Sequence, residues 1–142
     1  MITCTKIIEF DTAHRVFTNE NSKCEMLHGH RYRAEITIQR CDVALDGDGM
    51  VFDFKDIKRI IKNWIDTNWD HNVILSDKDT KLAFDIEKNT GQKVYIVKNP
   101  TAEILAKELF TVCNKLLENF QVKCIKVKIF ETPSSYAIYS EK

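Results

Sequence analysis

The hydrophobic pattern of the chain alternates near both ends and takes a helical spacing in between. Apolar side chains occupy every second position in residues 3–12 and 32–40, and again in residues 122–130 and 136–139. Such alternation is typical of β-strands that bury one face and expose the other. The pattern therefore predicts a sheet with one face on the core, which limits the fold to a few layered arrangements.

Two segments in the middle of the chain have the apolar spacing of helices. The first carries apolar residues at intervals of three and four, and Asp53 precedes it as a capping residue. The second follows Pro100, which we expect in its first turn, with Glu103 near the positive end of its dipole. Because strands precede and follow the helices, we expect an α+β fold, an antiparallel sheet with helices on one face. The first apolar stripe consists of Ile57, Ile60, Ile61, Trp64 and Ile65.

The connections between these segments are polar or irregular. Residues 15–29 are rich in Asn, Ser, Lys and Glu, a composition typical of a loop. The sequence Asp-Gly-Asp-Gly at 46–49 predicts a turn before a short extended stretch at 50–52. Between the two helices lie a polar segment at 76–89 and a short apolar run at 94–97.

Length and charge narrow the class of protein. A chain of 142 residues fits a single domain over 1–142, because domains of ~100–150 residues are the commonest. Its 21 basic and 21 acidic residues cancel, which argues against binding nucleic acid or an anionic membrane through a broad basic field. No apolar run is long enough to cross a bilayer, and the first residues do not form a signal peptide. We therefore expect a cytoplasmic protein.

The five cysteines are an odd number without a Cys-x-x-Cys pair, which argues against a disulfide framework. Cys4, Cys41, Cys113 and Cys124 lie in or beside the periodic segments, where we expect structural roles. Cys24 lies in the polar loop and has three interpretations. It is the fourth ligand of a structural metal, a base or nucleophile activated by a nearby cation, or an inert buried thiol. The polar surroundings disfavour burial, and we favour the base over the ligand.

Three of the four histidines have the spacing of a metal site. His28 and His30 are separated by one glycine, so in an extended chain both side chains point to the same face. His14 lies at the end of the preceding predicted strand, a plausible antiparallel neighbour of the segment with His28 and His30. Its imidazole could therefore supply a third nitrogen. Three histidines with an open fourth position are the ligand set of catalytic zinc. The alternative is a surface histidine pair beside a buried structural histidine.

Two further motifs carry carboxylates. Asp70-His71 follows the first helix, where the carboxylate could orient the imidazole for acid–base chemistry. The alternative is a histidine at a helix C-terminus beside a solvated aspartate. Glu131-Thr132 ends a strand, where the carboxylate could accept two N–H groups of a heterocycle, or could simply be solvated.

Together, these motifs resemble the 6-pyruvoyl-tetrahydropterin synthases and their bacterial relatives, from residue 6 to residue 139. The three residues between Cys24 and His28 resemble the 6-carboxy-tetrahydropterin synthase branch of queuosine biosynthesis, because the animal-type enzymes have a longer gap. The matching motifs are Phe10-Asp11-Thr12-Ala13-His14-Arg15, Cys24-x-x-x-His28-Gly29-His30, Gly49-Met50-Val51-Phe52-Asp53-Phe54, Asp70-His71, Asn99-Pro100-Thr101-Ala102-Glu103 and Glu131-Thr132.

The resemblance implies a zinc-dependent lyase acting on 7,8-dihydroneopterin triphosphate. The products would be 6-carboxy-5,6,7,8-tetrahydropterin, acetaldehyde and triphosphate. In that family, Cys24 matches the proton acceptor and His71 matches the histidine that assists it. Asp70 matches the aspartate that supports this histidine. The zinc ligands match His14, His28 and His30, and the substrate-binding positions match Glu131, which anchors the pterin, Thr101 and Thr132.

The resemblance also implies the tunnelling fold, a four-stranded antiparallel sheet with two helices on one face. Subunits of that fold assemble into rings, usually hexamers, with active sites between subunits, so Asp70 and His71 would serve a neighbour's zinc. Because the implied substrate is a triphosphate, a neutral chain must gather Lys and Arg locally. The chain departs from the family at Asp11-Thr12, where small residues are frequent, and at 76–98, a longer connection expected to be a loop with a short helix.

Two other functions stay open from the sequence. A 6-pyruvoyl-tetrahydropterin synthase would eliminate triphosphate but keep the carbon chain, so its product distinguishes it. A non-catalytic module stabilised by zinc would use Cys24 as a fourth ligand and would show no turnover.

Overall fold

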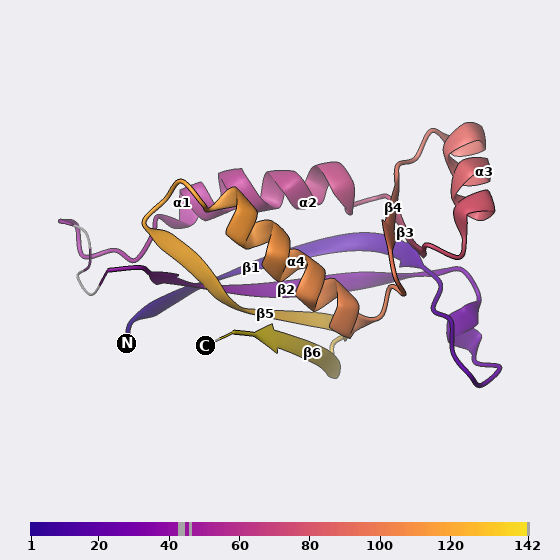
Figure 1. The fold of residues 1–142 in the computed structure, drawn as a ribbon, viewed down its shortest axis with the longest axis horizontal. Helices are drawn as coiled ribbons and strands as arrows, with labels where there is room; N and C mark the ends of the chain where they lie inside the picture. Colours follow the sequence, from indigo (N-terminus) through magenta and orange to yellow (C-terminus); the bar gives the residue numbers. More distant parts are fainter. Residues whose placement is uncertain (43–44, 46, 142) are drawn as a thin grey trace.

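The computed structural model describes residues 1–42, 45 and 47–141, and six strands within this part form one mixed sheet (Figure 1). The sheet order is β4-β3-β1-β2-β5-β6. The strands are β1 (Thr3–His14), β2 (His28–Arg40), β3 (Val73–Ser76), β4 (Val94–Val97), β5 (Val122–Thr132) and β6 (Ser135–Ser140). The helices are η1 (Lys23–Glu25), α1 (Phe54–Ile57), η2 (Lys58–Lys62), α2 (Asn63–Asn68), α3 (Thr80–Thr90) and α4 (Ala102–Leu116).

The predicted antiparallel strands form the larger part of the sheet. β1 pairs with β2, β2 with β5, and β5 with β6, all antiparallel. In the first pair, Phe10 lies opposite Tyr32 and His14 opposite His28. Opposite residues share a face of the sheet, so the even-numbered side chains of β1 and β2 point to the same side. Phe10 and Tyr32 are fully buried there, and their rings stack at 5.3 Å.

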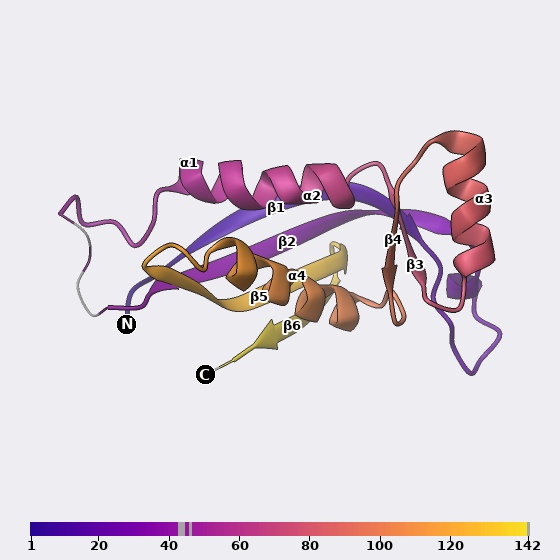
Figure 2. The ribbon, with the colours of Figure 1, turned by 45° about the horizontal axis from the view of Figure 1, so that its top comes forward.

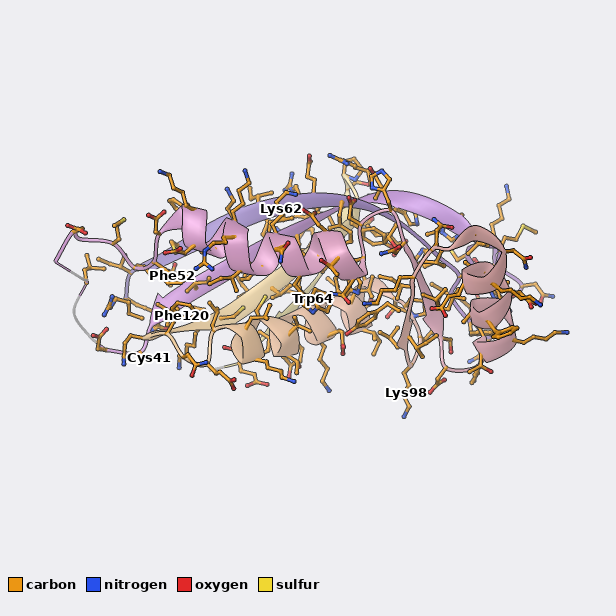
Figure 3. The ribbon with its side chains drawn as sticks, turned by 90° about the horizontal axis from the view of Figure 1, so that it is seen from above. Cys41, Phe52, Lys62, Trp64, Lys98 and Phe120 are labelled. Atoms are coloured by element: carbon orange, nitrogen blue, oxygen red, sulfur yellow. The ribbon has the colours of Figure 1, made fainter. Side chains whose placement is uncertain are left out.

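Two helical rows cover this face of the sheet (Figure 1). The first row runs without a break through α1, η2 and α2, and Asp53 caps it by accepting a bond from the Lys55 N–H. The second row is α4, capped by the Thr101 side chain. Trp64 lies on the side of α2 that faces α4, with its ring 5.3 Å from that of Trp69 (Figure 3). The apolar stripes thus form the predicted core between helices and sheet.

The prediction of a four-stranded antiparallel sheet with helices on one face is wrong at one edge. There β3 and β4 add two strands, parallel to each other and to β1. Helix α3 packs on the opposite face from the other helices, because Val73 and Leu75 form a separate cluster with Ala83. All four residues of β3 are buried, so its sequence is a continuous apolar run rather than an alternation. The expected loop with a short helix at 76–98 is therefore a strand–helix–strand unit.

Smaller predictions also need correction. Residues 50–52 form no strand, although Val51 is buried. Pro100 lies just before the capping residue of α4 rather than in its first turn. Asp46 of the predicted turn lies outside the described residues. None of the helices in the described part of the chain has the length and apolar character to cross a membrane.

The end of the molecule opposite α3 is held by aromatic packing. Phe52 and Phe120 contact each other there, with ring centres 5.4 Å apart, and both lie near Cys41 (Figure 3). The five cysteines are free thiols; Cys113 and Cys124 are buried, whereas Cys24 and Cys41 are exposed.

Candidate metal centre and active-site pocket

Three histidine side chains converge where β1 ends and β2 begins. Antiparallel pairing places His14 opposite His28 and Thr12 opposite His30, so all three imidazoles lie on the helix-covered side. The Nε2 atoms of His14 and His28 are 3.1 Å apart, and those of His28 and His30 are 3.0 Å apart. The ligand atoms of the three residues all lie within 4.8 Å of one another, which confirms the predicted cluster as a group able to hold a metal ion.

Backbone carbonyls orient two of these rings. The Nδ1–H of His14 donates to the Pro100 carbonyl at 2.8 Å, and that of His28 donates to the Met26 carbonyl at 2.6 Å. A carbonyl only accepts, so Nδ1 carries the hydrogen and each Nε2 presents a lone pair to the cluster centre. Two such lone pairs cannot bond each other, but both are satisfied by one cation. These nitrogens therefore fit a metal ion. Histidines that bind metals usually donate their other ring N–H to a carbonyl or a carboxylate, as His14 and His28 do here.

Burial keeps the deeper imidazoles of the cluster neutral. It lowers the pKa of His14 to about 4, and the side chain is 1% exposed. Burial also lowers the pKa of His30, against the opposing charge of Glu131. Neutral imidazole is the form that binds metals, so the ring nitrogens are free for ligation at neutral pH.

Tyr32 contacts two of the three histidines, and its role was not predicted from the sequence. Its hydroxyl lies 3.1 Å from Nδ1 and 3.4 Å from Nε2 of His14, and its ring contacts that of His30 at 5.5 Å. Burial raises the pKa of the tyrosine, so the hydroxyl keeps its proton. Tyr32 follows His30 by two residues on a strand, and that spacing was a signal that could have placed it on the same face.

A pocket of about 290 Å³ brings three more of the predicted residues together beside the cluster. Cys24, Thr101 and Glu131 all line it, with Tyr136 from β6. Glu131 also joins the pocket to the histidines, because its Oε1 lies 3.4 Å from Nε2 of His30. A carboxylate and a thiol thus line one pocket, and the carboxylate also contacts the histidine cluster, an arrangement typical of active sites.

The short helix η1 places Cys24 at this pocket. Ser22 caps the helix by accepting a bond from the Cys24 N–H, and the Val16 N–H donates to the Cys24 carbonyl at 2.9 Å. The thiol is exposed, which contradicts the buried interpretation. The group of side chains placed to hold one metal ion contains the three histidines and does not include Cys24.

Asp70 and His71 lie outside this pocket. His71 Nδ1 donates to Asp70 at 2.8 Å, and the other Asp70 oxygen accepts from the Asp11 N–H. The hydrogen bond and charge of Asp70 raise the pKa of His71, whose side chain is 79% exposed. For Asp70, burial opposes ionisation, but hydrogen bonds from Asp11 and His71 outweigh it and lower the pKa. This hydrogen-bonded pair, the Asp70–His71 dyad, does not line the pocket of Cys24 within one chain.

Thr132 is also separate from the thiol. It lines a second pocket, of about 330 Å³, with His30 and Glu131, and this pocket includes Arg31 and Arg33. Asp11 and Thr12, where the chain differs from the family pattern, both form polar contacts. The Thr12 hydroxyl donates to the Asn72 carbonyl, and Asp11 forms an ion pair with Arg31.

Known relatives match nearly the whole chain. The chain is 46% identical to a 6-carboxy-5,6,7,8-tetrahydropterin synthase of Rickettsia bellii over 96% of this chain and 98% of that protein. It is 30% identical to the enzyme of that name from Haemophilus influenzae, over 99% and 100% of the two chains.

Solved structures share the fold. A 6-pyruvoyl tetrahydropterin synthase of Caenorhabditis elegans has a TM-score of 0.68 and 25% identity, over 99% of this chain and 96% of that one. An uncharacterized protein from Wolinella succinogenes has a TM-score of 0.82 and 23% identity, over 99% and 98%. The family model described as 6-pyruvoyl tetrahydropterin synthase matches residues 3–142. The chain therefore belongs to the 6-pyruvoyl tetrahydropterin synthase family.

Proposed function

We propose that this protein is a zinc-dependent 6-carboxy-5,6,7,8-tetrahydropterin synthase. It converts 7,8-dihydroneopterin triphosphate to 6-carboxy-tetrahydropterin, acetaldehyde and triphosphate, and its product feeds queuosine biosynthesis. One observation carries the proposal: three histidine Nε2 atoms converge beside Glu131, which also lines the pocket of Cys24. The names of the relatives from Rickettsia bellii and Haemophilus influenzae support the choice of product.

Zinc fits the ligand set better than a hard cation, because imidazole nitrogen suits zinc and oxygen ligands suit magnesium or calcium. Tetrahedral ligation at about 2.0–2.1 Å separates two nitrogens by about 3.3 Å. The Nε2 separations of 3.0 and 3.1 Å are close to that value. When bound, zinc supplies a Lewis acid that polarises oxygen atoms of the substrate side chain.

The residues of the pocket have separate tasks in this reaction. Glu131 accepts N–H groups of the pterin ring and orients the substrate, and Thr101 lines the same pocket. Cys24 takes the carbon-bound proton of the substrate side chain. His71 transfers the oxygen-bound proton, and Asp70 holds its ring and keeps its pKa high.

This assignment requires two subunits. His71 is exposed and separate from its own chain's pocket, so it reaches the reacting atoms by serving a neighbouring copy. We therefore propose a homo-oligomer, with a ring of six as the expected form, whose active sites lie between subunits. The site is incomplete in a single chain.

The substrate's phosphates need cations near the pocket. Arg31 and Arg33 line the pocket that His30 and Glu131 share, which places positive charge beside the proposed pterin site. Arg31 is paired with Asp11 and Glu9, so the local charge is partly compensated. A neighbouring subunit would supply the remainder.

Product analysis tests the proposed function directly. The zinc-loaded protein is mixed with 7,8-dihydroneopterin triphosphate, and the pterins and acetaldehyde are quantified. Equal amounts of acetaldehyde and 6-carboxy-tetrahydropterin support the proposal. A 6-pyruvoyl product without acetaldehyde would make the protein a 6-pyruvoyl-tetrahydropterin synthase, and retained zinc without turnover would make it a structural module.

A further inference from the structure

The segment Asn99-Pro100-Thr101 contacts the histidine cluster, the pocket of Cys24 and the loop between β1 and β2. The Pro100 carbonyl orients His14, and Thr101 caps α4 and lines the Cys24 pocket. Asn99 contacts the loop between β1 and β2. Its side-chain amide accepts from the Phe17 N–H and donates to the Phe17 carbonyl, both at 3.0 Å. A single amide thus satisfies both backbone groups of one loop residue.

A second contact holds the same loop from the strand–helix–strand unit. Arg15 donates from Nε to Asp79 at 2.8 Å, and Asp79 is 7% exposed. The Arg15 guanidinium and the Lys78 ammonium also lie over the Phe17 ring, at 5.0 and 5.7 Å. Both views place this loop at the same end of the molecule as α3, β3 and β4 (Figures 1 and 2).

The held residues are bonded directly to the turn that carries the thiol. Next to Phe17, the Val16 N–H donates to the Cys24 carbonyl at 2.9 Å. On its other side, the N–H and hydroxyl of Thr18 both donate to Glu25, each at 3.1 Å. The position of Phe17 therefore fixes the position of Cys24 through two short paths. A shift of about 1 Å at a reacting group can lower a rate about 100-fold.

We propose that Asn99 is a positioning residue for Cys24, acting through its amide clamp on Phe17, with the Arg15–Asp79 pair as a second brace. Through Asp79, the strand–helix–strand unit of β3, α3 and β4 also contributes to the position of this loop. The inference rests on the proposed function of Cys24 as the proton acceptor. It assigns no contact between Asn99 and the substrate.

The chain offers a matched control for the test. Asn114 forms the same kind of clamp, accepting from the Cys124 N–H and donating to the Cys124 carbonyl, both at 3.0 Å. Asn99→Ala should lower kcat about 100-fold with little change in KM and with full zinc content. Hydrogen exchange should accelerate over residues 15–27 but not over β1 or β2. Asn114→Ala should lower the unfolding temperature and leave kcat and exchange at 15–27 unchanged.

A half-clamp variant keeps the test usable if Asn99→Ala folds poorly. Asn99→Asp retains the acceptor for the Phe17 N–H and loses the donor, so its kcat and exchange should fall between those of the wild type and Asn99→Ala. Three results overturn the proposal: unchanged kcat, unchanged exchange at 15–27, or loss of zinc in proportion to activity. The last would mean that the variant acts on His14 through Pro100. Hydrogen exchange is independent of turnover, so it tests the clamp even if the wild type proves to have another activity.

Discussion

The histidine cluster and the Asp70–His71 dyad use the same side chain in opposite environments. His14 is buried, its partner on Nδ1 is a neutral carbonyl, and burial lowers its pKa to about 4. His71 is exposed, its partner is a carboxylate, and the pKa is raised. The first environment favours the neutral imidazole, whose lone pair suits a cation, and the second favours the protonated imidazole, which suits proton transfer. Burial and the charge of the partner, rather than residue type, produce this difference.

The backbone positions the hydrogen-bond partners of His14 and His71. Pro100 lies just before the capping residue of α4, and its carbonyl accepts from His14 Nδ1 at 2.8 Å. His71 lies in the turn after α2 with a φ of 58°, and its N–H donates to the Asp11 carbonyl at 2.7 Å. That positive φ is uncommon for a side-chain-bearing residue, and it aims the imidazole at Asp70 and solvent.

The largest expected effect comes from removing a ligand from the first region. His28→Ala should abolish stoichiometric zinc and turnover, with an affinity loss greater than the ~100-fold seen for outer-sphere partners of metal ligands. Zinc is measured by atomic absorption after dialysis. His71→Ala is the matched control and should keep its zinc. Equal zinc retention in the two variants would remove the distinction between the regions.

The second effect separates the thiol from the ligands. Cys24→Ala should keep near-stoichiometric zinc while kcat falls by about 10²–10⁴, the usual contribution of a general base. Cys41→Ala, which removes the other exposed thiol, should have wild-type kinetics. Loss of zinc in Cys24→Ala would instead make the cysteine a fourth ligand.

The third effect concerns the dyad. Asp70→Asn removes the charge, and weakens the hydrogen bond, that raise the pKa of His71, so this pKa should fall toward 6.5, as read from NMR titration of the imidazole. The limb of the activity profile that requires protonated His71 should move to lower pH. Because the folded pKa of His71 is above its unfolded value, the pair's contribution to stability is present below pH 6.5 and is lost as pH rises through the folded pKa.

The control for that experiment is an exposed acid on α2, the helix that precedes the dyad. Asp66 pairs with Lys62 at 2.6 Å, and Asp66→Asn should leave both the His71 titration and the activity profile unchanged. A shift of similar size in the two variants would attribute the effect to general charge rather than to the dyad.

The smallest effect lies at the far end of the molecule. Phe120→Ala removes the edge contact with Phe52 and should lower the free energy of unfolding by about 1 kcal/mol. Zinc content and kcat per folded molecule should not change. Chemical denaturation measures the first quantity. A fall in zinc binding would show that global stability, rather than local geometry, controls the cluster.

Periodicity predicted the antiparallel strands and both core helices, because each has one buried face. It did not predict β3, whose four residues are all buried, so no alternation marks it as a strand. Local spacing likewise predicted that His28 and His30 lie on the same face of the strand. The partners that orient the site were not predictable in this way: the Pro100 carbonyl carries no residue-specific signal, and Asn99 meets Phe17 across 82 positions of sequence.

In the proposed mechanism, the two histidine regions form one active site across a subunit boundary. The direct test of this arrangement is turnover by mixed oligomers, made by co-expressing Cys24→Ala and His71→Ala chains with different affinity tags. Each variant alone is expected to be inactive. If the thiol and the imidazole come from neighbouring subunits, the mixed oligomers regain about a quarter of wild-type turnover, since randomly mixed sites then include some with both residues intact. If the mixed oligomers are as inactive as the separate variants, the thiol and the imidazole act within one chain. That result would contradict an active site shared between subunits.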